Sequence, residues 1–97
     1  MVEYLHDAIR ASAGTNIIIQ ARVLDEFNNE VKENVYFIIC DKEDQTKHLI
    51  EVEAFDGGEA LIFEIPAEIT KDFKGRYWYC IKHNNEQMCF LQPIYFV

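Results

Sequence analysis

The sequence is short of positive charge. Lysine and arginine number 9 against 17 aspartates and glutamates, which leaves a net charge of −8 with the 3 histidines neutral. An acidic surface repels phosphate groups, and no cluster of lysines and arginines interrupts it. We therefore expect the protein to bind neither nucleic acid nor an anionic membrane.

Long apolar runs and secretory signals are also missing. The longest apolar run, Val35–Cys40, has six residues, whereas a helix needs about 20 to cross a bilayer. Acidic residues and a histidine stand near the start of the sequence, where a secretory signal would have its apolar segment. We expect the protein to be made in the cytoplasm.

Cysteine and histidine are few and scattered. The cysteines are Cys40, Cys80 and Cys89, and the histidines are His6, His48 and His83. Neither set has the spacing of a zinc site, and an odd number of cysteines is typical of free thiols in a reducing compartment. We expect no metal site and no cofactor.

The sequence lacks the residue combinations of a cysteine–histidine catalytic pair, a calcium loop or a phosphate-binding loop. Cys80 and His83 lie three residues apart in one expected strand, so they point to opposite faces and cannot share a hydrogen bond. The acidic stretch 41–44 lacks the glycine of a calcium loop, and no lysine follows Gly57 and Gly58 as in a phosphate-binding loop. We expect a protein that is not an enzyme, with no catalytic residues.

What the sequence does contain is a period of two, the pattern of strands. Of its 97 residues, 49% are hydrophobic, which is enough for the core of a single domain spanning residues 1–97. Alternation predicts strands within residues 15–25, 35–40, 48–54, 60–65, 76–83 and 87–97. Residues 66–73 have room for at most one turn of helix. Residues 1–12 contain helix formers but also alternate, and we favour a first strand or an extended arm over a helix.

Short strands separated by turns every 8–12 residues predict an all-β, immunoglobulin-like sandwich of two antiparallel sheets and about seven strands. Gly75 stands two residues before Tyr77, where a loop enters a strand. In such sandwiches a tyrosine at this place can turn its hydroxyl back onto the backbone. The alternative is an ordinary core tyrosine.

The last expected hairpin has an apolar surface on both sides. A two-residue turn at Asn84 and Asn85, with positive φ at both, predicts a register that pairs residues on either side of it. The predicted pairs are Ile81 with Met88 and Tyr79 with Phe90 on one face, and Cys80 with Cys89 and Trp78 with Leu91 on the other. The cysteine pair would be close enough for a disulfide, but we expect both thiols to be reduced.

A sandwich sheet normally has one buried face and one wet face. The strand Val35–Cys40 repeats the conflict, since it is apolar on both sides. We therefore expect an exposed apolar protein interface made of Tyr36, Ile38, Trp78, Cys80, Cys89 and Leu91. The alternative is that the N-terminal segment or the chain's own end covers this face.

Several segments resemble a known group of proteins. Gly14 and Thr15 open a strand, VLDEFNNEV reads as strand, turn and return, and GEALIFEIPAEIT leads into FKGRYWYCIKH. Over about residues 9–97 the chain resembles the small immunoglobulin-like domains of tailed-phage structural proteins, such as upper-baseplate N-terminal domains and tail or head accessory proteins. The resemblance implies a virion component without cofactors, which docks on other virion subunits or on itself.

Two other classes stay open. A carbohydrate-binding module would use Tyr36 and Trp78 as a stacking platform. A bacterial immunoglobulin-like subunit of a surface complex would have the same sequence features.

Overall fold

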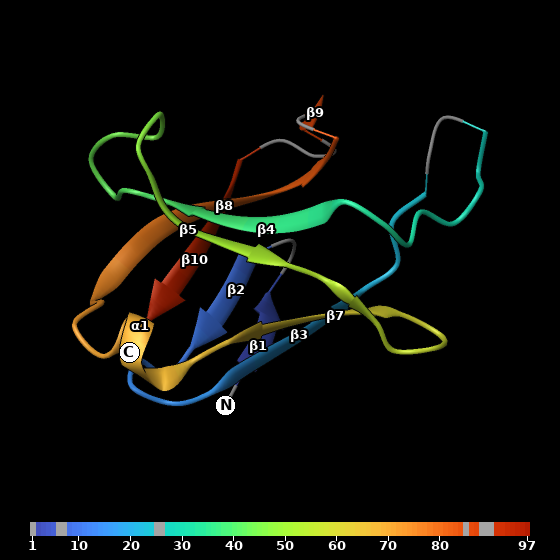
Figure 1. The fold of residues 1–97 in the computed structure, drawn as a ribbon. Helices are drawn as coiled ribbons and strands as arrows, with labels where there is room; N and C mark the ends of the chain where they lie inside the picture. Colours follow the sequence, from blue (N-terminus) through green and yellow to red (C-terminus); the bar gives the residue numbers. More distant parts are fainter. Residues whose placement is uncertain (1, 6–7, 25–26, 85, 88–90) are drawn as a thin grey trace.

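The chain forms two β-sheets that pack face to face (Figure 1), so the predicted all-β, two-layer class is confirmed. The computed structural model describes residues 2–5, 8–24, 27–84, 86–87 and 91–97. In this part of the chain, one sheet has the order β1 (Val2–Leu5), β2 (Ala8–Ala11), β10 (Gln92–Phe96), β8 (Gly75–His83), β4 (Val35–Cys40) and β5 (His48–Glu53), and β9 (Glu86–Gln87) also pairs with β8. The other sheet has the order β3 (Ile17–Ala21), β7 (Leu61–Ile65) and β6 (Phe55–Asp56).

The strands are more numerous and less uniform than expected. The described residues form ten strands, against the prediction of about seven, partly because β6 and β9 are two-residue strands. β2 pairs with β10 in parallel, so the larger sheet is not purely antiparallel as predicted. Parallel neighbours need a long connection, and nearly the whole chain lies between these two strands.

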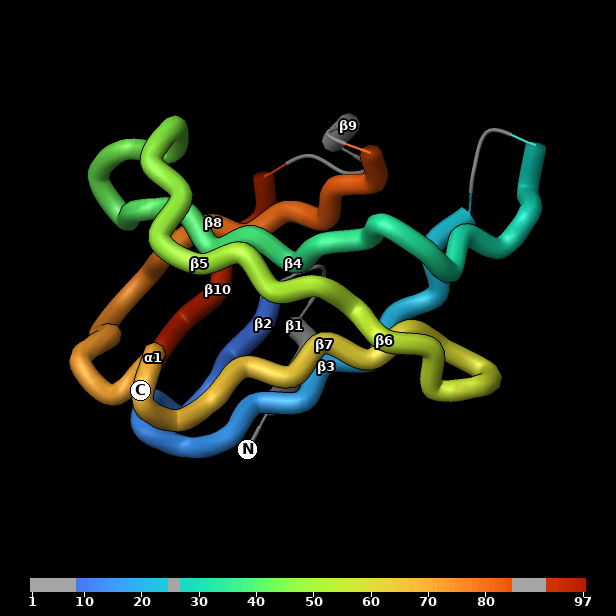
Figure 2. Tube along the Cα trace, viewed as in Figure 1, coloured from blue at the N-terminus to red at the C-terminus, as the bar shows by residue number. Residues whose placement is uncertain are grey.

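The N-terminal segment is extended, as the alternation predicts, and it forms the strands β1 and β2. Ile9 and Ala11 are buried in the main core. The backbone of Ala11 also accepts a hydrogen bond from the N–H of Val97 at 3.0 Å. The arm therefore completes the sandwich instead of projecting from it: β1 contacts β3 of the second sheet, and Figure 2 shows β2 beside β10.

The main core lies between the two sheets and is built from alternate residues. Phe63 and its neighbours of like parity on β7 point inward, as do Ile17 and Ile19 on β3. Phe37 on β4 meets Phe63 across the gap, with ring centroids 5.5 Å apart, and stacks on Tyr79 at 5.1 Å. In each of these strands the residues of the main core alternate along the chain, as the period of two requires.

The turn after β8 begins in the predicted register. Lys82 pairs with Gln87 and His83 with Glu86. Asn84 has the predicted positive φ, at 50°. Its expected partner in the turn, residue 85, lies outside the described residues, as do residues 88–90.

Beyond this turn the predicted register is wrong by two residues. Trp78 lies opposite Pro93 and not Leu91, and Tyr79 lies opposite Gln92. A shift of two residues keeps every side chain on its original face, because the side-chain period of a strand is two. The predicted faces of β8 therefore survive, whereas the predicted partners of Trp78 and Tyr79 are wrong. The predicted partners of Cys80 and Ile81 lie outside the described residues.

Tyr77 lies near the start of β8, and its ring packs against Phe73 and Phe96 in the core. Its hydroxyl accepts a long hydrogen bond, 3.4 Å, from the backbone N–H of Lys74. Gly75 between them has a φ of +90°, a conformation that side chains rarely adopt. The hydroxyl thus returns to backbone just upstream, as expected for a tyrosine at this entry to a strand.

Replacing Tyr77 with phenylalanine should lower the free energy of unfolding by about 1 kcal/mol, because the ring packing is kept and one hydrogen bond is lost. Urea unfolding followed by circular dichroism measures this. Tyr95→Phe is the matched control, since Tyr95 is exposed, and it should change the free energy by less than about 0.5 kcal/mol. Equal effects of the two substitutions would contradict a role for the Tyr77 hydroxyl.

Candidate protein interface

The strands β4 and β8 are apolar on both sides, and the second sheet fills only one of them. Phe37 and Ile39 belong to the main core between the sheets. Ile38 and Cys80, which pair across β4 and β8, belong to a separate apolar cluster. This cluster lies on the side of the larger sheet that faces away from β3 and β7, which we call the outer face.

The outer cluster has a sealed base and a partly open rim. Ile38, Cys40 and Cys80 are each 2% exposed or less. Tyr36, Trp78 and Leu91 pack around them and are only partly buried. The part of this cluster that a partner can touch is therefore its rim.

The structure brings together five of the six residues expected at the interface. Tyr36, Ile38, Trp78, Cys80 and Leu91 share the outer cluster, and Cys40 joins them. Cys89 lies outside the described residues. Ile38 and Cys80 are buried within the protomer, so the accessible apolar area that they were expected to supply is small. Trp78 is not sealed inside, which keeps the expected contact surface available.

The corrected register adds two residues that sequence reasoning missed. Pro93 lies beside Trp78 in the sheet, and Tyr95, which is 37% exposed, lies beside Arg76. Both point outward, because Ile94 between them is buried in the main core. The outward parity of β10 was readable from its alternation, but its position next to Trp78 depended on the register.

Trp78 carries a positive charge over its ring. The guanidinium of Arg76 lies 4.9 Å from the ring centroid, within the range of a cation–π contact. Such a contact is worth about 0.5–1 kcal/mol where it is exposed. It also gives the aromatic rim a basic border.

A hollow of about 240 Å³ opens at the other end of the outer face, lined by Tyr36, Ile38, Glu51 and Lys82. The neighbouring carboxylate of Glu53 accepts a hydrogen bond from the Tyr36 hydroxyl and, together with its charge, raises the pKa of Tyr36 above its ordinary value. Glu51 lies 3.1 Å from Nδ1 of His48. This end of the face thus combines an aromatic wall with carboxylates.

The two described thiols are unsuited to chemistry. Cys40 and Cys80 are both buried. Burial raises the pKa of Cys40, against the opposing influence of the Lys82 ammonium and a hydrogen bond with Cys80. A thiolate is the reactive form of cysteine, so this environment keeps Cys40 unreactive.

The acidic loop after β4 uses its carboxylates internally. Oδ1 of Asp41 accepts hydrogen bonds from the backbone N–H groups of Glu43 and Asp44, at 2.8 and 3.2 Å. Asp44 in turn accepts from Thr46, which lowers the pKa of Asp44. Within the described ranges, no three histidine, cysteine or acidic side chains are placed to hold a metal ion.

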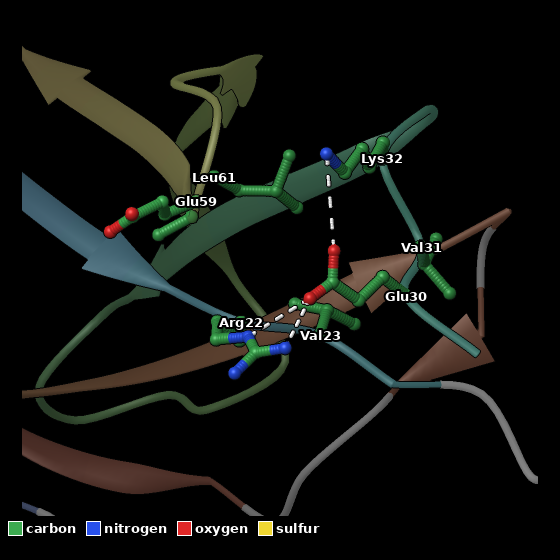
Figure 3. A pocket seen from close by; sticks show the side chains of 8 residues that line it. Arg22, Val23, Glu30, Val31, Lys32, Glu59 and Leu61 are labelled. Carbon is green, nitrogen blue, oxygen red and sulfur yellow. Dashed lines mark hydrogen bonds and ion pairs between the residues drawn. The ribbon is translucent and has the colours of Figure 1, made fainter. Parts of the chain in front are cut away.

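A second, smaller pocket is lined by an ion-pair network of Arg22, Glu30 and Lys32, next to the β6–β7 turn (Figure 3). The carboxylate of Glu30 pairs with the guanidinium of Arg22, and Nζ of Lys32 lies 3.9 Å from Glu30 and 3.7 Å from Asp56. The pocket encloses about 10 Å³, which is room for about one water molecule. Its charges tie a loop to the sandwich and leave no room for a ligand.

Comparisons with known proteins do not assign the chain. No profile of a known protein family, no curated protein and no solved structure matches it. In the described part of the chain, no helix has the length and apolar character needed to cross a bilayer. A functional assignment of the chain therefore depends on the geometry of the outer face.

The burial of the two thiols predicts how they react with an alkylating reagent. In the native protein near neutral pH, iodoacetamide should leave Cys40 and Cys80 unmodified, because both are 1% exposed. In urea without reductant both should be alkylated, as peptide mass mapping would show. Labelling of the native protein as fast as of the unfolded protein would contradict the burial, and a pair left unlabelled in urea would contradict the expected reduced state.

Proposed function

We propose that this chain is a non-enzymatic, immunoglobulin-like domain that docks on other protein subunits through its outer face. The observation that carries the proposal is the second apolar cluster on β4 and β8. Its aromatic rim, formed by Tyr36 and Trp78 and continued by Tyr95, is partly accessible. Partly exposed aromatic residues beside arginine are typical of protein interfaces.

The strand order supports the immunoglobulin-like assignment. The order β10-β8-β4-β5 facing β3-β7-β6 corresponds to the G-F-C-C′ and B-E-D strands of a variable-type domain. The hydrogen bond from the Lys74 N–H to the Tyr77 hydroxyl at the start of β8 agrees with the same assignment. In this arrangement the outer face belongs to the larger sheet, which contains β4 and β8.

Two observations support a binding role over catalysis. The thiols of Cys40 and Cys80 lie at the sealed base of the outer cluster, where a substrate does not reach them. The carboxylates of Asp41 and Asp44 are engaged by their own loop. The accessible part of the outer face offers rings, charges and a hollow, which suit recognition of another surface.

The assembly that we propose is the virion of a tailed phage, in its tail, baseplate or head. Its support is the resemblance of residues 9–97 to immunoglobulin-like domains of phage structural proteins. The net charge of −8 favours protein subunits over packaged nucleic acid as the partner.

Trp78→Asp should weaken docking at least tenfold and leave the fold intact, because the indole lies at the rim and a buried carboxylate at a contact is costly. The measurement is solution mass by light scattering, with and without the products of neighbouring genes. Phe55→Asp is the matched control, since Phe55 is an exposed aromatic residue (49%) on the other sheet.

Two results would contradict the proposal. If Trp78→Asp unfolds in urea far earlier than Phe55→Asp, the indole is part of the core and not of a contact surface. If glycans change the fluorescence of Trp78, the single tryptophan of the chain, the aromatic rim is a carbohydrate platform instead.

A further inference from the structure

We propose that the occupant of the outer face is a second copy of this chain, placed by a two-fold axis that joins the acidic end of one face to the basic end of the other. The inference rests on the proposed function, since it names the partner of the same face. Its support is the distribution of charge across the sheet.

The outer face is acidic at one end. Glu51 and Glu53 lie on β5, at the margin of the larger sheet, opposite Ile38 and Tyr36 of β4. Both glutamates are exposed. Glu51 lines the hollow of about 240 Å³ on the side away from β8, and Glu53 lies beside it, next to Tyr36.

The opposite end of the face is basic. Arg76 lies near the start of β8, and in the sheet register Tyr95 separates it from Arg10 of β2. Both arginines are exposed. β5 and β2 are four strand spacings apart, which is roughly 19 Å across the strands. The two ends are also offset along the strands, because Glu51 lies level with Cys80 and Arg10 lies level with Arg76.

This charge distribution differs from that of the molecule as a whole. In the sheet register the positions of outward parity hold three basic residues, Arg10, Arg76 and Lys82, and three acidic residues, Glu3, Glu51 and Glu53. The entire chain has 17 acidic residues against 9 basic ones. The outer face is therefore one part of the surface on which two copies of an acidic protein can meet without local repulsion.

A two-fold axis between two copies can place unlike charges opposite each other. If the axis lies in the plane between two outer faces, perpendicular to the line from the acidic to the basic end, each acidic end meets the partner's basic end. The contact is made twice, as symmetry requires of an isologous interface. The apolar rim around Trp78 then lies near the axis and meets its own copy.

The hollow forms an open recess at the acidic end of the outer face. It is open, and its walls include the Tyr36 side chain and the Glu51 carboxylate. Lys82 also lines the hollow, on the β8 side, across β4 from Glu51. On the β5 side a guanidinium can stack on the Tyr36 ring and pair with the Glu51 carboxylate. We therefore expect an arginine from the basic end of the partner to enter it.

The test is a charge exchange between two variants. In the first, Glu51→Arg and Glu53→Arg make both ends basic. In the second, Arg10→Glu and Arg76→Glu make both ends acidic. Wild-type protein should have about twice the 11.4 kDa mass of one chain in sedimentation equilibrium. Each variant alone should be monomeric, with at least a tenfold weaker dimer, and an equimolar mixture should restore the dimer.

The test has a matched control and a second pair of variants. Glu64→Arg with Glu68→Arg changes charge by the same amount at exposed positions on β7 and the short helix α1 (Ala67–Thr70) and should leave the dimer unchanged. If either exchanged variant loses its circular dichroism signal, Glu53→Arg and Arg76→Glu alone replace the pairs.

A wild-type protein that is monomeric at every concentration measured overturns self-association. The docking proposal would still stand or fall with Trp78→Asp and other subunits. A dimer that the exchanged variants do not weaken, or a mixture that stays monomeric, overturns the two-fold arrangement.

Discussion

The structure depends on the pairing of β4 with β8 in the middle of the larger sheet. Both strands are apolar on both faces, so their pairing creates two apolar surfaces, while the smaller sheet of β3, β7 and β6 covers only one. Burial of Phe37 and Ile39 on the inner side supplies the main core. The same backbone geometry necessarily projects Ile38 and Cys80 to the other side.

The chain covers part of this second apolar surface with its own side chains. Ile38, Cys40 and Cys80 are sealed by Tyr36, Trp78 and Leu91, and Arg76 covers part of the indole. Surface that remains apolar is bordered by arginine at one end and by glutamate at the other. An apolar centre with a polar border is the usual anatomy of a protein interface, and this resemblance is the basis of the docking proposal.

Sequence reasoning was strongest where one face of a strand is fully buried. The bounds of β4 followed from its apolar run, and the shared faces of β3 and β7 followed from alternation. It failed at β10, where the register is two residues away from the prediction. β10 is bound by β8 on one side and by β2 on the other, and a hairpin rule that considers only the nearest turn cannot include the second neighbour.

The sequence by itself determined the all-β class, the faces of most strands and the excess of apolar surface, because all three follow from a period of two. Tertiary structure alone decided which outward residues are accessible and which charges border them. Ile38 and Trp78 are both outward by parity, yet Ile38 is sealed while Trp78 stays partly open. Neighbours on other strands make that difference, and their placement depends on register and sheet order.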